Sequence, residues 1–213
     1  MTAIYYKDVP SYRLDLFKAV RQAGDNLSNL LALAEIVNTC HDISSTTRPD
    51  DFDIAIFSGN YTRAWIRRGN GYFSMAIPFQ VITEGEFISF NIDNLSEPVS
   101  GELISIFRNA IQTCATSSFC HEDIALGIND SFGIEVPMCL KYADAFAELL
   151  TEDHGYFRYD HDPDNENGEF HPLHHLDFFF KNTSAVKIGL SSKVGLDLLH
   201  SLCDSSVAKR YIR

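Results

Sequence analysis

Basic residues are scarce in this chain of 213 residues, which has 17 lysines and arginines against 29 aspartates and glutamates. The formal net charge of -12 is repelled by the phosphates of nucleic acids and by anionic membranes, so non-specific binding to either is disfavoured. The same charge favours a partner with a basic surface. We expect that partner to be another protein.

Long hydrophobic runs are also missing. No stretch approaches the ~20 apolar residues that a membrane-spanning helix needs, so we expect no membrane partner. The first residues lack the basic segment and apolar run of a secretion signal. The five cysteines contain no C-x-x-C pair and are odd in number, which is typical of reduced thiols inside cells. Together these absences predict a cytoplasmic protein.

The composition of the chain suffices for a globular core, since 45% of its residues are hydrophobic and 22% are charged. Apolar residues at helical spacing predict five helices, over 12–23, 26–40, 101–114, 138–153 and 191–212. Alternation of apolar and polar residues predicts strands over 53–59, 61–69, 72–82, 86–93, 156–161, 175–182 and 185–190. Residues 115–136 fit neither period well, and we expect a loop with short extended pieces there.

These elements predict an α+β fold. The first four strands are joined by short turns containing glycine, which favours an antiparallel meander, and a C-terminal hairpin adds further strands. We expect the resulting antiparallel sheet to be flanked by helices. No linker divides the chain clearly, so we predict a single domain over 1–213, with lobes 1–117 and 118–213 as the alternative.

One strand of the meander carries Arg63, Trp65 and Arg67 on the same face. Such a face is able to stack on a base or to bind an anion. Packing of Trp65 in the core, with the arginines at its edges, is the simpler interpretation and the one we favour.

Titratable groups concentrate in the hairpin region between Tyr156 and Phe180. Five of the eight histidines lie in or directly before it, namely His154, His161, His171, His174 and His175. Carboxylates are dense there too: Asp160, Asp162, Asp164, Glu166, Glu169 and Asp177. The acidic segment between the two strands has the composition of an exposed turn, because Pro163 and Gly168 favour turns and the carboxylates favour water.

Alternation along the two hairpin strands sorts these groups by face. Arg158 and Asp160 share one face of the first strand, and His175 and Asp177 share one face of the second. If the apolar sides meet, these four side chains project together, with cross-strand neighbours ~5 Å apart. His171 is placed to reach in from the loop.

Two carboxylates with one or two histidines suit Mn²⁺, Zn²⁺ or Mg²⁺, and the candidate ligands are Asp160, His171, His175 and Asp177. Such an ion activates water for the hydrolysis of a phosphodiester, and the planar guanidinium of Arg158 suits the phosphate group. A metal-free alternative uses His175 as a general base oriented by Asp177 or Asp160. In a structural interpretation, which we favour, Arg158 simply pairs with Asp160 or Asp177 across the sheet.

The pattern RYDHDPDN, FHPLHHLDFF and KIGL resembles the C-terminal signature of a family of uncharacterised bacterial proteins of about this size. The resemblance covers roughly Arg158–His175 and implies a bacterial or phage origin. It also implies an accessory role, in defence or on mobile elements. It assigns no activity and therefore no catalytic residue.

Two classes of function stay open, and the sequence does not decide whether the chain is an enzyme. Our leading hypothesis is a non-catalytic cytosolic binding protein that acts within a complex, because no catalytic motif is complete. The alternative is a metal-dependent, nuclease-like phosphodiester hydrolase that uses the 156–180 hairpin. Convergence of Asp160, Asp177 and a histidine nitrogen in an open cleft favours the hydrolase, whereas a buried ion pair that places Arg158 in that space disfavours it.

Overall fold

The computed structural model describes residues 2–69, 71–85, 87–116, 120–152, 155–180 and 186–208, so His154 lies outside the described residues. The chain forms two compact units that are interleaved along the sequence. The first contains residues 1–9, 43–77 and 154–213, and the second contains residues 10–42 and 78–153. This division does not test the single domain or the lobes 1–117 and 118–213, which stay predictions.

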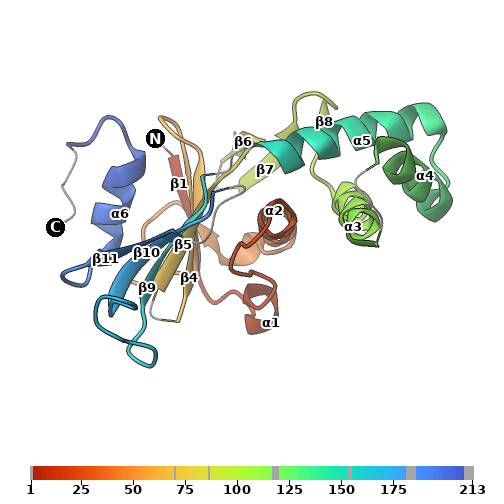
Figure 1. Ribbon diagram of the computed structural model, residues 1–213. Coiled ribbons are helices and arrows are strands. Elements are labelled where there is room, and N and C mark those ends of the chain that lie inside the picture. The colour runs from red at the N-terminus through yellow and green to blue at the C-terminus, as the bar shows by residue number, and fades with distance from the viewer. Residues whose placement is uncertain are drawn as a thin grey trace. The chain divides into compact units, whose positions relative to one another are not determined.

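The first unit is built on one large sheet (Figure 1). Its elements are β1 (Thr2–Tyr6), β2 (Ser44–Ser45), β3 (Ile54–Ser58), β4 (Arg63–Arg68), β5 (Gly71–Ala76), β9 (Phe157–His161), β10 (His174–Phe178), β11 (Val186–Leu190) and the helix α6 (Leu196–Cys203). The eight strands follow the order β11-β10-β9-β5-β4-β3-β1-β2, and each described pair is antiparallel.

The second unit combines helices with a small sheet. Its elements are α1 (Ser11–Leu14), α2 (Ala23–Thr39), β6 (Gln80–Glu84), β7 (Phe87–Ile92), β8 (Glu97–Pro98), α3 (Gly101–Thr116), α4 (His121–Phe132) and α5 (Val136–Thr151), and the 3-10 helix η1 (His41–Ile43) leads out of it. β6, β7 and β8 form a three-stranded antiparallel sheet, and α2 packs against β7 and α3. The two sheets with their helices confirm the predicted α+β class.

One face of the large sheet packs against α6. Trp65, Tyr159 and Leu176 point to this face and are fully or almost fully buried with Leu199 of the helix. Burial of each such side chain stabilises the fold by roughly 1.5–3 kcal/mol. Because strand residues alternate, Arg158, Asp160, His175 and Asp177 lie on the opposite face of the same strands.

The buried position of Trp65 confirms the packing interpretation of its strand. The guanidinium of Arg63 is buried too and lies 5.2 Å above the ring of Phe157. It donates hydrogen bonds to Ser74 Oγ (3.0 Å) and to the carbonyl of Gly155. Arg67 pairs with Asp51. The arginines therefore have partners within the protein.

Several predicted elements differ from the structure. The third strand of the meander breaks into β5 and β6, which lie in different sheets, because Pro78 has no N–H with which to continue a ladder. The loop predicted at 115–136 contains the helix α4. The N-terminal segment, for which we predicted no element, forms β1 between β2 and β3.

The predicted helix over 12–23 is reduced to the single turn α1. The cause is Asn29 of α2, whose buried amide binds both backbone groups of Lys18 at 2.8 Å and holds that segment out of a helix. The second helix also begins earlier than predicted, at Ala23. Asp25 lies in the first turn of this helix. Its carboxylate accepts hydrogen bonds from the N–H groups of Arg21 and Gln22 (3.0 and 3.1 Å) and so caps the start of the helix.

Two glycines give a matched test of how β9 docks on β5. A methyl group at Gly71 would overlap the backbone carbonyl of Tyr159, whereas one at Gly24 in α2 would meet no atom within 4 Å. We expect Gly71→Ala to lower the free energy of unfolding by about 1–3 kcal/mol. Gly24→Ala should raise it by up to ~1 kcal/mol because alanine favours the helix. Urea denaturation measures both, and equal effects would contradict the close approach of the two strands.

Candidate functional site

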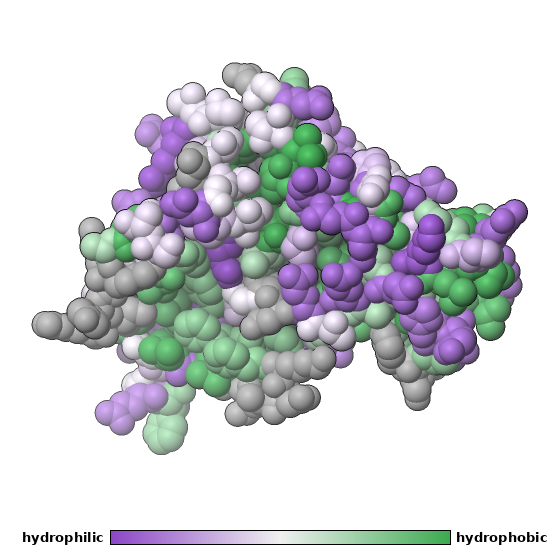
Figure 2. Space-filling model, turned by 90° about the horizontal axis from the view of Figure 1, so that it is seen from above, coloured by the Kyte–Doolittle hydropathy of each residue, from purple (hydrophilic) through white to green (hydrophobic). Residues whose placement is uncertain are grey.

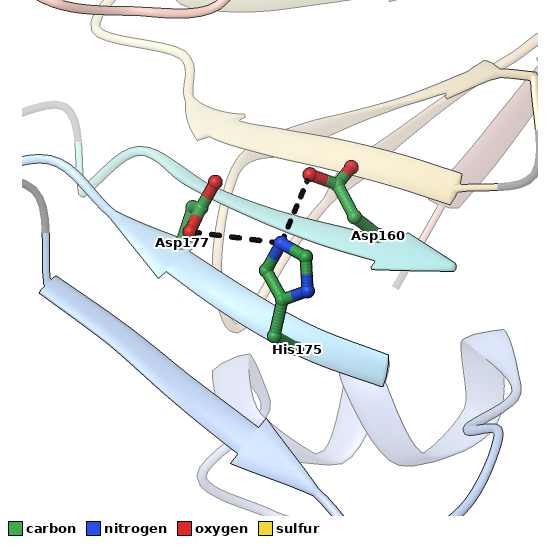
Figure 3. Close-up of side chains that lie close together, drawn as sticks. All are labelled: Asp160, His175 and Asp177. Atoms are coloured by element: carbon green, nitrogen blue, oxygen red, sulfur yellow. Dashed lines mark ion pairs between the residues drawn. The ribbon is translucent and has the colours of Figure 1, made fainter. Parts of the chain in front are cut away.

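The predicted polar residues come together on β9, β10 and β11. The register places Asp160 opposite His175 and Arg158 opposite Asp177, and these four residues share one face, as alternation predicted. It also places Lys187 of β11 opposite Asp177. Figure 3 shows Asp160 and Asp177 directed toward the same imidazole nitrogen of His175.

Arg158 joins the two carboxylates of this cluster. Its Nε lies 2.6 Å from Asp160 Oδ2, and its Nη2 lies 2.6 Å from Asp177 Oδ2. Lys187 Nζ adds a second cation at 2.9 Å from Asp177 Oδ1. Burial opposes the charge on Arg158, but Asp160, Tyr156 and Asp177 together raise the pKa of its guanidinium. Two cations therefore balance two carboxylates.

The hydrogen bonds of His175 fix its tautomer. The residue is 1% exposed, and its Nδ1 lies 2.8 Å from the carbonyl oxygen of Pro172, which only accepts hydrogen bonds. Nδ1 therefore carries the hydrogen. Nε2 lies 3.1 Å from Lys187 Nζ and 3.5 Å from Asp160 Oδ2. Nε2 is thus the ring nitrogen directed toward the carboxylates.

This geometry includes the donor atoms of a metal site. Among the described residues, Asp160, His175 and Asp177 each offer one ligand atom, and these atoms lie within 4.8 Å of one another. A histidine that donates its other N–H to a backbone carbonyl is also the usual arrangement of a metal ligand. The set fits Zn²⁺ or Mn²⁺ by chemistry. However, a metal ion would have to displace Arg158 and Lys187 from the carboxylates.

His171 is adjacent to this cluster but directs its polar atom elsewhere. Its ring lies edge-on to that of His175, with the centroids 4.8 Å apart. Its Nε2 lies 3.1 Å from Asp162 Oδ2. Asn165 donates two hydrogen bonds to the same carboxylate, and with His171 it lowers the pKa of Asp162. His171 and Asp162 thus form a second polar pair beneath the loop.

His161 and His174 occupy the other face of the sheet, because side chains alternate along each strand. Their rings stack with centroids 4.8 Å apart, and His174 Nδ1 lies 3.0 Å from the hydroxyl of Tyr159. Burial, followed by the proximity of His161, lowers the pKa of His174. The histidines of the hairpin therefore act as two separate groups.

The loop between β9 and β10 is exposed, and backbone hydrogen bonds close its base. Residues 163–170 are all exposed, as predicted for a turn, and Phe170 at the tip is 90% exposed. The N–H of Asn167 donates to the carbonyl of His171 (2.9 Å), and the N–H of Asp162 donates to that of Leu173 (3.0 Å). Gly168 adopts a φ of 51°, which glycine tolerates best. An exposed aromatic side chain is thus presented by an ordered acidic loop.

Lys187 was not predicted as a member of the cluster. Alternation within 186–190 does place it on the face opposite Val186 and Ile188. Its position across from Asp177 depends on the register of β10 with β11, which alternation does not specify.

Comparison of the chain with protein-family models, with curated proteins and with solved structures found no match in any of the three. Among the described helices, none is long and apolar enough to span a membrane.

Removal of Arg158 tests the charge balance of the cluster. Arg158→Met leaves two close carboxylates with only Lys187 as a cation, and we expect a loss of about 1–3 kcal/mol in the free energy of unfolding. The control is Arg48→Met, because Arg48 pairs with Asp197 on the surface and should contribute less than about 1 kcal/mol. Chemical denaturation of both variants measures the difference. Equal losses would mean that Arg158 is an ordinary surface residue.

Proposed function

We propose that this protein is a non-catalytic binding protein that presents the loop 162–173 to a protein partner with a basic surface. The observation that carries the proposal is the exposure of Phe170 at the tip of an acidic loop whose base is held by hydrogen bonds. An aromatic side chain supplies a large contact area with only two rotatable bonds. Because the backbone is already ordered, little conformational entropy is lost on binding.

The charges around Phe170 define the partner. Asp164, Glu166 and Glu169 are exposed on the same loop. An acidic rim around an apolar anchor attracts a pocket that is surrounded by lysine or arginine, and it increases the rate of association. The net charge of -12 acts in the same direction over longer distances.

The polar cluster supports this loop in the proposal. His175 holds the carbonyl of Pro172 through Nδ1, and its ring packs against His171 at the end of the loop. Arg158 and Lys187 fix the strands on either side by ion pairs. The carboxylates and histidines then have a structural role, which agrees with the balance of charges in the cluster.

The resemblance of the hairpin to an accessory family extends the proposal to the cell. On this resemblance, we propose that the protein acts in the cytosol of a bacterium as an accessory component of a defence system or a mobile element. The basic partner would then belong to the same system.

Phe170→Ser tests the proposed contact. We expect the affinity for the partner to fall at least ~30-fold, as at a binding hot spot. The stability of the free protein should change by less than about 0.5 kcal/mol because the side chain is exposed. The tagged protein would first be used to isolate partners from a bacterial host, and each purified partner would then be titrated calorimetrically.

Tyr12→Ser is the matched control, since Tyr12 is an exposed aromatic residue of the other unit. It should leave the affinity unchanged. Binding that survives Phe170→Ser for every isolated partner would refute the role of the loop.

A second candidate, the metal-dependent phosphodiester hydrolase, is favoured by the convergence of Asp160, His175 and Asp177. These three residues would hold a divalent cation, which supplies an activated water molecule. Arg158 would bind the phosphate with its planar fork.

Metal binding distinguishes the two functions. For the binding protein, we expect no stoichiometric metal by elemental analysis and no change in melting temperature on addition of Mn²⁺ or Zn²⁺. The hydrolase predicts stoichiometric metal that His175→Ala removes, together with metal-dependent cleavage of bis(p-nitrophenyl) phosphate. Asp144→Ala is the control, because Asp144 pairs with His121 away from the cluster and should have no effect on either measurement.

A further inference from the structure

The outer edge of β11 is an unpaired strand edge. β11 ends the eight-stranded sheet, and no strand among the described residues pairs with its other side (Figure 1). Such an edge offers a row of backbone N–H and C=O groups to another strand. The other end of the sheet offers much less, because β2 has only two residues.

The side chains of β11 favour pairing. Val186 and Ile188 are 36% and 42% exposed, and they lie on the same face as the buried Leu190. On the surface drawn in Figure 2, hydrophobic side chains are interspersed with hydrophilic ones, which is normal for a folded protein. The apolar residues of β11 differ because they accompany backbone groups that pair with no described strand.

Within the described strand 186–190, neither proline nor an outward-directed charge protects the edge. Proteins commonly block such edges with proline or with an exposed charge, often lysine. The segment 186–190 contains no proline, and its single charge is Lys187. That lysine is turned to the polar face, where Asp177 and His175 bind its Nζ at 2.9 and 3.1 Å.

We propose that β11 pairs with β11 of a second copy of the chain, antiparallel and centred on Ile188, so that the two large sheets become one. In this register Ile188 faces the partner's Ile188, and Val186 faces the partner's Leu190. Lys187 faces the partner's Gly189. All five residues of both strands are then paired.

This register is favoured over its two neighbours. A pairing centred on Gly189 would leave Val186 and Lys187 without partners inside the strand. A pairing centred on Lys187 would set two lysines opposite each other, which is destabilising. The register centred on Ile188 avoids this contact, and no acidic residue lies in the strand. Gly189 has no side chain to clash, and its polar face is already covered by Pro172, whose Cγ would lie 2.8 Å from an added Cβ. The edge is therefore self-complementary, which is what a two-fold dimer requires.

The dimer does not depend on the loop 162–173, so the two proposals fail separately. Sedimentation velocity of the full chain should show a monomer–dimer equilibrium. Ile188→Lys, which sets like charges against each other at the two-fold axis, should weaken the dimer at least about tenfold. Leu126→Lys is the control, because Leu126 is exposed on α4 in the other unit, and it should leave the equilibrium unchanged.

A second variant tests the proposal even if Ile188→Lys fails to fold. Facing residues of antiparallel strands have Cα atoms ~4.5–5.5 Å apart, which suits a disulfide. Mild oxidation of Ile188→Cys should therefore give a covalent dimer whose linkage, mapped by mass spectrometry, joins position 188 of both chains. A wild-type monomer at all concentrations, a dimer that tolerates Ile188→Lys, or linkages through the native cysteines alone would each overturn the proposal.

Discussion

The ion pairs of Arg158 are the constraint on which the hairpin depends. One guanidinium contacts a carboxylate on its own strand and another on the neighbouring strand, each at 2.6 Å. Neither aspartate is tolerable so close to the other without a cation between them. With Lys187 on the third strand, the pairs tie together β9, β10 and β11, and this end of the sheet carries the exposed loop and the unpaired edge.

The two faces of these strands contribute to folding in different ways. On one face, Tyr159 and Leu176 are buried against α6 and supply apolar burial. On the other, charged groups meet at half-buried positions, where ion pairs contribute geometry more than net stability. The register satisfies both faces at once, because a slip by one residue would move the charges into the apolar core.

The sequence predicted this hairpin well because it depends on a local rule. Alternation alone placed Arg158, Asp160, His175 and Asp177 on one face. The contribution of Lys187 was not predictable in the same way, since it depends on the pairing of β11. One miss elsewhere has a similar cause: Asn29 overrides the helical pattern around Lys18 by hydrogen bonds between residues 11 apart in the sequence. Local pattern does not encode such contacts.

Charge balance alone does not separate a structural ion network from a metal site. A divalent cation would neutralise Asp160 and Asp177 as completely as Arg158 and Lys187 do together. The side chains of Arg158 and Lys187 have the advantage over a metal ion. They are tethered to the chain and act at a high effective concentration, whereas a free ion must be drawn from solution. An anionic phosphodiester is the kind of ligand that would draw both cations away from the carboxylates. In a hydrolase built on this cluster, bound substrate would therefore strengthen the binding of the metal ion, and the bound metal ion would strengthen the binding of the substrate.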